Sequence, residues 1–163
     1  MSSCGTPDGC STTSESTSAL CPSCGLTGVS VDPITLKALL TPDGLRRGVP
    51  ADPRYCPTAH CQTVYFSSTA GVRFEEADVI VPVHAKQMDR ETVPVCYCFG
   101  YTTKSIRNEI ESTGASTATA SITAEVKAGR CACEVRNPKG SCCLGDVARA
   151  ERHIALSLTL TAS

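Results

Sequence analysis

Short alternating and apolar runs in the first half of the chain predict a small sheet. The stretch GLTGVSVD after Cys24 alternates in polarity, and the run QTVYF after Cys61 is rich in the residues that favour strands. A further strand or short helix is predicted in VRFEEADVIVPV. Proline is favoured in the first turn of a helix, so the stretch ITLKALL behind Pro33 predicts one short helix. Residues 21–90 are therefore expected to form a β-rich domain.

The second half carries the spacing of helices instead. Ile106 and Ile110, four residues apart, supply one apolar face, and Thr102 or Thr103 can cap the start of that helix. The pattern predicts helices over residues 103–111, 121–128 and 144–155. Residues 91–156 are expected to form a small helical domain.

The two ends of the chain are predicted to be tails. Residues 1–20 are rich in Ser and Thr and poor in hydrophobic residues, which is typical of disorder, and residues 157–163 are taken as a C-terminal tail. Cys4 and Cys10 lie in the first tail, and their spacing matches no common metal-binding knuckle. They are interpreted as incidental thiols or occasional metal scavengers.

Composition changes this picture by pointing to a covalent or metal staple. The chain has no Trp, three Phe and four Tyr, so a large aromatic core is excluded, while twelve cysteines are available to hold a small core together. Residues 1–20 contain no Lys, Arg or apolar run of a signal peptide, and the longest apolar stretch, VIVPV at 79–83, is too short to span a bilayer. A cytoplasmic protein is expected, in which clustered cysteines bind metal more often than they form disulfides.

Charge excludes one class of partner. The formal net charge is −1, and no basic run or dense basic face is visible. Nucleic-acid binding is therefore not expected, and neither is a membrane partner.

Two cysteine pairs in the first half have the arrangement of a structural zinc site. Cys21 and Cys24 form a Cys-x2-Cys turn, and Cys56 and Cys61 form a wider second pair. Two such pairs can surround one zinc ion with four thiolates in a closed tetrahedral site. His60, beside the last cysteine, is an alternate ligand. Zinc bound there would contribute folding energy to a segment with little core.

A second set of cysteines has a different spacing. Cys96 and Cys98 are too close for the usual zinc knuckle, and they are followed much later by the stretch CACEVRNPKGSCC. Two thiolates at each end of a helical hairpin can bind the two irons of a 2Fe-2S cluster. Two predicted helix N-termini, near 102 and 144, follow the cysteines and would face this anionic group. The later stretch offers four candidates for the remaining two ligands, namely Cys131, Cys133, Cys142 and Cys143.

At these motifs the chain resembles a family. The segments VCYCFGYTTKSIRNEI and AGRCACEVRNPKGSCCLGDVARA look like the N-terminal region of CopZ-type copper chaperones, which combines a zinc site with a 2Fe-2S site. The second half is also similar to bacterioferritin-associated ferredoxin. The resemblance implies that Cys96 and Cys98 bind the cluster and that two of the four later cysteines complete it. Cys131 matches the ferredoxin spacing, with Cys133 as alternate, and Cys143 precedes the last helix, with Cys142 as alternate.

These observations together predict the α+β class, with a small zinc-ribbon-like β-rich domain followed by a small helical 2Fe-2S domain. The three histidines, His60, His84 and His153, are scattered, so no enzyme activity through side-chain catalysis is expected. The predicted function is one-electron transfer linked to the handling of copper or another metal, with a copper ion or copper-transport protein and a redox protein as partners. The alternative is a regulatory or metal-binding module with two structural zinc sites, or a thiol buffer for soft metals.

Overall fold

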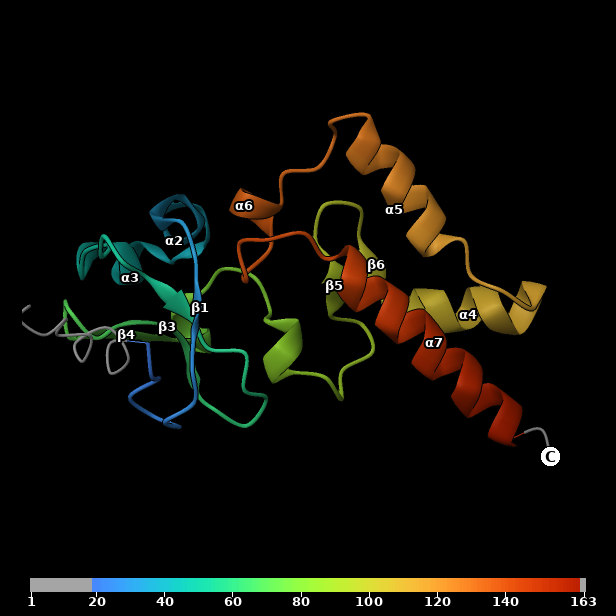
Figure 1. Ribbon diagram of the computed structural model, residues 1–163, viewed down its shortest axis with the longest axis horizontal. Coiled ribbons are helices and arrows are strands. Elements are labelled where there is room, and N and C mark those ends of the chain that lie inside the picture. Colours follow the sequence, from blue (N-terminus) through green and yellow to red (C-terminus); the bar gives the residue numbers. More distant parts are fainter. Residues whose placement is uncertain (1–18, 162–163) are drawn as a thin grey trace, which may run out of the picture.

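The computed structural model describes residues 19–161 and shows strands in the first half of the chain and helices in the second (Figure 1). The predicted α+β class is confirmed. The predictions for residues 1–18, including Cys4 and Cys10, lie outside the described residues.

The first half is built on an antiparallel sheet of four short strands in the order β1-β2-β3-β4. Every residue of β3 is buried, and its Tyr65 pairs with Tyr55 of β2. The alternating and aromatic runs therefore form strands as predicted, although most of the strands are very short. The strands are β1 (Val29–Ser30), β2 (Arg54–Tyr55), β3 (Thr63–Ser67) and β4 (Val72–Glu75).

Two short helices pack with this sheet. Helix α2 (Pro33–Leu39) begins where proline predicted it, and the Asp32 side chain accepts a hydrogen bond from the Ile34 N–H. Helix α3 (Pro42–Arg46) was not predicted, and Thr41 caps it through the Gly44 N–H. The core of this half contains aliphatic side chains of α2 and aromatic side chains of the sheet, among them Leu36, Leu39, Tyr55, Tyr65 and Phe74.

The second half begins with a two-stranded ribbon and continues as helices. Two single-turn 3-10 helices, η1 (Glu76–Asp78) and η2 (His84–Lys86), connect it to the sheet. Its elements are β5 (Pro94–Cys96), β6 (Tyr101–Thr102), α4 (Thr103–Thr113), α5 (Ala118–Lys127), α6 (Cys133–Arg136) and α7 (Leu144–Thr161).

The helices confirm their predicted positions but differ in extent. Helix α4 starts at Thr103, because the Thr102 side chain accepts from the Ser105 N–H while the Ser105 hydroxyl reaches back to the Thr102 N–H. Helix α5 begins earlier than residue 121. Helix α7 continues to Thr161, so residues 157–161 are helical and do not form the predicted tail. The short helix α6 was not predicted.

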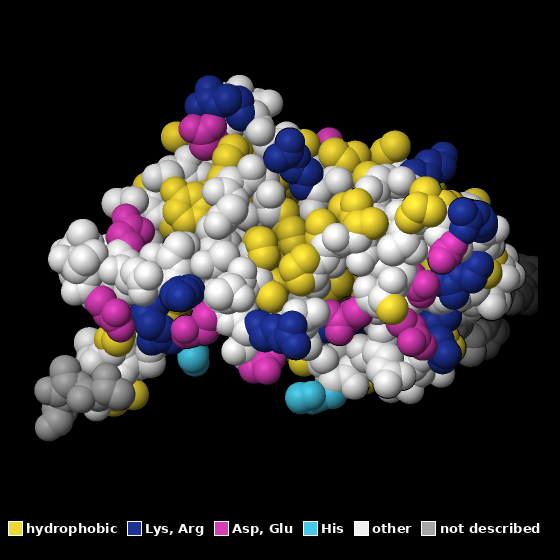
Figure 2. All heavy atoms as spheres, turned by 180° about the vertical axis from the view of Figure 1, so that it is seen from behind, with side chains coloured by type: hydrophobic (Ala, Val, Ile, Leu, Met, Phe, Trp, Pro, Cys, Tyr) yellow, Lys and Arg dark blue, Asp and Glu magenta, His cyan; other side chains and the backbone are white. Residues whose placement is uncertain are grey.

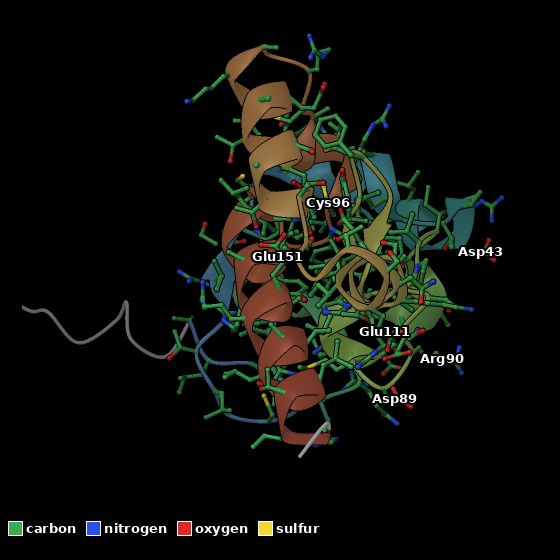
Figure 3. The ribbon with its side chains drawn as sticks, turned by 90° about the vertical axis from the view of Figure 1, so that its right-hand side faces the viewer. Asp43, Asp89, Arg90, Cys96, Glu111 and Glu151 are labelled. Carbon is green, nitrogen blue, oxygen red and sulfur yellow. The ribbon has the colours of Figure 1, made fainter. Side chains whose placement is uncertain are left out.

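The core of the second half collects apolar side chains from α4, α5 and α7 around two cysteines. Ile106, Ile122 and Val147 are at most 1% exposed, and they share one cluster with Cys96 and Cys143. Figure 3 places Cys96 in the interior, near the point where α5 and α7 approach each other. Two of the predicted metal ligands are therefore embedded in this core.

The two halves meet along the segment that contains α6, which lies beside α2 (Figure 1). Apolar side chains also reach the surface over the middle of the molecule, with charged side chains around them (Figure 2). None of the described helices is both long and apolar enough to cross a membrane.

Candidate functional site

Four cysteine sulfurs converge beside the sheet, and we call them the first cysteine group: Cys21, Cys24, Cys56 and Cys61. All four sulfurs lie within 4.8 Å of one another. The separation is 3.8 Å between Cys21 Sγ and Cys61 Sγ, and 3.7 Å between Cys24 Sγ and Cys56 Sγ. A tetrahedral zinc ion with Zn–S bonds of about 2.3 Å requires its sulfurs to be about 3.8 Å apart. Two of the separations match this value and the others stay below 4.8 Å, so the group fits one zinc ion.

Backbone turns bring these sulfurs together. The Gly25 N–H donates to the Cys21 carbonyl at 2.8 Å, and Gly25 has a φ of 71°, a left-handed conformation that glycine adopts without strain. On the other side, the Cys56 N–H donates to the Val64 carbonyl and the Cys61 N–H to the Thr58 carbonyl. One pair of ligands is thus held by a tight turn and the other by the start of β3.

The environment of the first group already favours a thiolate at one position. The Thr58 hydroxyl, 3.5 Å from Cys24 Sγ, is the main cause that lowers the pKa of Cys24 to about 6. Burial raises the pKa of Cys61 to about 12. A bound cation would stabilise the thiolate form of every member, which is the form that binds metal.

The alternate ligand His60 does not join this group. Its side chain is exposed, and the convergent atoms are the four sulfurs. Within residues 19–161 the first group is the one set of three or more candidate ligands whose atoms all lie within 4.8 Å of one another.

A second cysteine group, defined as Cys96, Cys98, Cys133 and Cys143, has a different geometry. Its sulfurs form two close pairs. Cys98 Sγ is 3.7 Å from Cys133 Sγ. The side chains of Cys96 and Cys143 lie close enough for each to shift the pKa of the other, and both are at most 1% exposed.

The contact inside each pair changes the acidity of its members. The hydrogen bond from Cys143 lowers the pKa of Cys96 to about 6, and the same contact raises the pKa of Cys143. Burial raises the pKa of Cys133 to about 12, and the neighbouring Cys98 adds to this rise. In each pair, one thiol thus makes it harder for the other to lose its proton, which is the electrostatic cost that a bound metal ion would relieve.

Two predicted candidates are left outside the pairs. Cys131 was preferred by spacing, but Cys133 is the residue beside Cys98. Cys142 is exposed, whereas its neighbour Cys143 is 1% exposed and lies in the core. The reason is local, because Cys133 begins α6 and Cys143 directly precedes α7, and these helix starts turn both side chains inward. Sequence spacing alone does not record this difference in burial.

Backbone N–H groups lie around the second group, where they can stabilise negative charge on its sulfurs. The Ala132 N–H lies 3.3 Å from Cys98 Sγ and donates to it. The Cys143 carbonyl accepts from the Asp146 and Val147 N–H groups, so Cys143 stands at the start of α7. The dipole of this long helix favours negative charge at its N-terminus.

The nearby basic side chains are mostly paired with acids. Arg107 bonds to Glu91 at 3.0 Å. Further ion pairs join Arg130 to Glu125 and Lys139 to Asp146. These ion pairs reduce the positive potential that the basic side chains would otherwise contribute.

The fold and the first group define a class of protein: a module in which two cysteine-bearing turns beside a small antiparallel sheet offer four thiols to one metal ion. More particularly, the chain belongs to the family of CopZ-type zinc-binding domains. Residues 18–80 match this family, which is described as a zinc binding domain.

Two comparisons with one relative, in sequence and in structure, extend the likeness beyond residue 80. The chain is 33% identical over 123 residues to a protein named copper chaperone CopZ from Archaeoglobus fulgidus. The matched part is 76% of this chain and 57% of that protein. The X-ray structure of the N-terminal domain of Archaeoglobus fulgidus CopZ is 30% identical, with a TM-score of 0.65, and covers 80% of this chain and 95% of that domain. The likeness thus includes the helical half.

Proposed function

We propose that this protein is a metal-handling protein with two resident metal centres, zinc in the first cysteine group and a 2Fe-2S cluster in the second. When bound, such a cluster supplies or accepts one electron at a time. The name of the Archaeoglobus fulgidus relative points to copper as the metal that is handled. Copper(II) that takes up one electron becomes copper(I), and a redox protein partner would be the source of that electron. No side-chain catalysis is needed for this role.

One observation carries the proposal for the second group, namely its division into two close pairs. A mononuclear site needs all four sulfurs near one point, as in the first group. Within the described residues, no three sulfurs of the second group lie within 4.8 Å of one another. Two thiolates for each of two irons would instead divide the ligands into pairs. This geometry supports a cluster over a second structural zinc ion.

The residues that would hold the cluster follow from the pairs. Cys98 and Cys133 would bind one iron, and Cys96 and Cys143 the other. The Ala132 N–H would donate to a ligand sulfur. Burial of Cys96 and Cys143 in the core would exclude water from one side of the site.

Purification without oxygen followed by metal analysis tests the proposal. We expect about one zinc and about two irons per chain. We also expect a visible absorption band that bleaches on reduction by one electron, and a paramagnetic signal in the reduced protein. A colourless protein with about two zinc ions and no iron would contradict the proposal and support the non-redox alternative.

Serine variants at neighbouring cysteines provide matched controls. We expect Cys98→Ser and Cys133→Ser to lose or strongly shift the visible spectrum, because a ligand of one iron is replaced. Cys131→Ser and Cys142→Ser, each next to or near a ligand, should keep the normal spectrum and iron content. Loss of iron in the Cys131 variant with retention in the Cys133 variant would show that the ligand assignment is wrong.

A further inference from the structure

The segment between Cys133 and Cys143, which we call the arm, is held by side chains of the first half of the chain. The Tyr65 hydroxyl in β3 donates to the Pro138 carbonyl at 2.6 Å. The Thr35 hydroxyl in α2 donates to the Glu134 carbonyl at 2.7 Å. Both donor residues are 0% exposed. Two buried hydroxyl groups thus bind the backbone of the arm between Cys133 and Cys143.

The arm also fits closely against α2. Gly140 has a φ of 66°, and a Cβ atom there would come within 2.9 Å of Thr35 Oγ1 and 3.3 Å of Val31 Cγ1. Such a separation is too short for a real Cβ contact, so the arm packs here by its bare backbone. The close approach leaves the arm little freedom to slide along the first half.

Hydrogen bonds within the arm make it rigid. Asn137, only 4% exposed, donates from Nδ2 to the Ser141 carbonyl at 2.7 Å and accepts from the Lys139 N–H at 3.2 Å. Its own N–H donates to the Cys133 carbonyl. A displacement at Pro138 would therefore be transmitted to both ends of the arm, where the cysteines lie.

Tyr65 is in turn fixed relative to the first cysteine group. Its strand follows Cys61, and the residue pairs with Tyr55, which precedes Cys56. The Cys56 N–H donates to the carbonyl of Val64, the neighbour of Tyr65. The sheet thus links the zinc-ligand geometry to the hydroxyl that holds the arm.

We propose that Tyr65 is a positioning residue through which the zinc-bearing half fixes Cys133 and Cys143 of the second metal centre, with Thr35 as its second anchor. The inference rests on the proposed function for the identity of that second centre. Tyr65 does not touch the metal ligands in this role. It acts by holding the Pro138 carbonyl, which would otherwise be buried without a hydrogen-bond partner.

The test uses Tyr65→Phe in the full chain, which removes the hydroxyl and keeps the ring. Tyr55→Phe is the matched control, because Tyr55 is also buried in the sheet, with its ring centroid 6.1 Å from that of Tyr65. Within residues 19–161, Tyr55 makes no hydrogen bond to the arm. Three quantities are measured: zinc content, amide hydrogen exchange of the arm, and the paramagnetic spectrum of the reduced protein.

For Tyr65→Phe we expect unchanged zinc content, exchange in the arm faster by about tenfold or more, and a shifted paramagnetic spectrum. Tyr55→Phe should keep the exchange rate and the spectrum of the unmodified protein. Thr35→Val removes the second hydroxyl without loss of volume and should also accelerate exchange in the arm. This variant keeps the inference testable if Tyr65→Phe fails to fold.

The outcomes separate this inference from the proposed function. Unchanged exchange in both Tyr65→Phe and Thr35→Val, or equal acceleration in Tyr55→Phe, would overturn the inference and leave the two metal centres in place. If the protein contains no iron but the arm still exchanges faster only in the Tyr65 and Thr35 variants, the proposed function fails while the positioning of the arm is supported.

Discussion

Cys24 and Cys61 belong to the same cysteine group but have very different acidities. The Thr58 hydroxyl lowers the pKa of Cys24 to about 6, and burial raises the pKa of Cys61 to about 12. Cys24 is half-buried, whereas Cys61 is buried. One thiol is therefore prepared for reaction and the other is protected.

In zinc-free, reduced protein we expect an alkylating reagent at about pH 7.5 to modify Cys24 much faster than Cys61, because the thiolate is the reacting form. The rate at Cys24 should fall as the pH is lowered through about 6, where the thiolate takes up its proton. Peptide mapping by mass spectrometry measures both rates. Thr58→Val should move the fall to higher pH, and an unchanged profile in that variant would contradict the assigned cause.

Gly140 occupies a position where only glycine fits well. Its φ is positive, and there is little space beside it for a Cβ atom. We expect Gly140→Ala to lower the free energy of unfolding by about 2 kcal/mol or more, from a positive φ and a contact with Thr35 Oγ1. Gly114→Ala is the control, since Gly114 also has a positive φ but nothing within 4 Å of its would-be Cβ. That control should lose only about 1 kcal/mol in denaturant unfolding. Equal losses would show that the close packing of the arm is unimportant.

At the scale of elements, helix α5 depends on carboxylates from other helices for its N-terminus. Its own N-cap residue, Thr117, makes no side-chain capping bond to the helix. Glu109 of α4 accepts from the Thr117 N–H at 3.1 Å, and Glu151 of α7 accepts from the Thr119 N–H at 2.9 Å. These bonds satisfy N–H groups that a helix start leaves free, and they fasten α5 to both neighbours.

The two carboxylates give a stability test. We expect Glu151→Ala to lower the free energy of unfolding by about 1 kcal/mol or somewhat more, as loss of a helix cap does. Circular dichroism during denaturant unfolding measures it. Glu111→Ala serves as control, because Glu111 is exposed on α4 and lies away from Glu151 in Figure 3. A similar loss in both variants would contradict the capping role.

Glu109 predicts a pH dependence of stability with a definite sign. Hydrogen bonds, first from the Thr117 side chain, hold the pKa of Glu109 below its ordinary 4.5 in the folded protein. Its contribution is therefore present above the unfolded pKa and is lost as the pH falls through the lower folded value. Glu109→Gln should be less stable than the unmodified protein at about pH 7, and the difference should shrink as the pH falls below the ordinary carboxyl range and Glu109 takes up its proton. A difference that stays constant across this range would refute the linkage.

The elements that could be predicted from the sequence have strong local signals. Thr102 and Ser105 together specify the start of α4, and Pro33 specifies the start of α2. Helices α3 and α6 are too short to be stable by themselves, and the Pro-Asp-Gly of α3 is equally typical of a turn. Helix α6 depends on contact with α2, which no local pattern records. The extension of α7 past Ala155 was missed because exposed Leu156 and Leu160 break the amphipathic pattern.

On the scale of the whole molecule, the sequence indicates which cysteines are candidate ligands more securely than it indicates which of them lie together. The four cysteines of the first group converge in the structure, and the sequence indicates this because two close pairs on turns allow few other arrangements. In the second half, Cys133 begins the arm whose backbone Thr35 and Tyr65 hold, whereas Cys131 precedes it. That information lies in contacts between distant parts of the chain, and spacing does not contain it.

Zinc in the first group should stabilise more than its own turns. We expect Cys56→Ser to lose zinc and to lower the melting temperature, because Cys56 is 0% exposed and packs with Phe66 beside the sheet. Metal analysis and thermal unfolding measure these effects. Cys142→Ser, at an exposed position, is the control and should leave both quantities unchanged. Retention of zinc in the Cys56 variant would show that a ligand of the first group is wrongly assigned.

The positions of the two cysteine groups along the chain also set an order of assembly during synthesis. The first group is complete once residue 61 has emerged, whereas the second group needs Cys143, and the bond from Tyr65 to Pro138 joins residues 73 positions apart. Because N-terminal parts of a chain fold first during translation, the zinc half can acquire its ion while the helical half is still on the ribosome. The Tyr65 and Thr35 hydroxyl groups are then already in place to bind the backbone of the arm when it emerges. Growth in zinc-depleted medium should therefore lower the iron content expected of the proposed second centre as well as the zinc content.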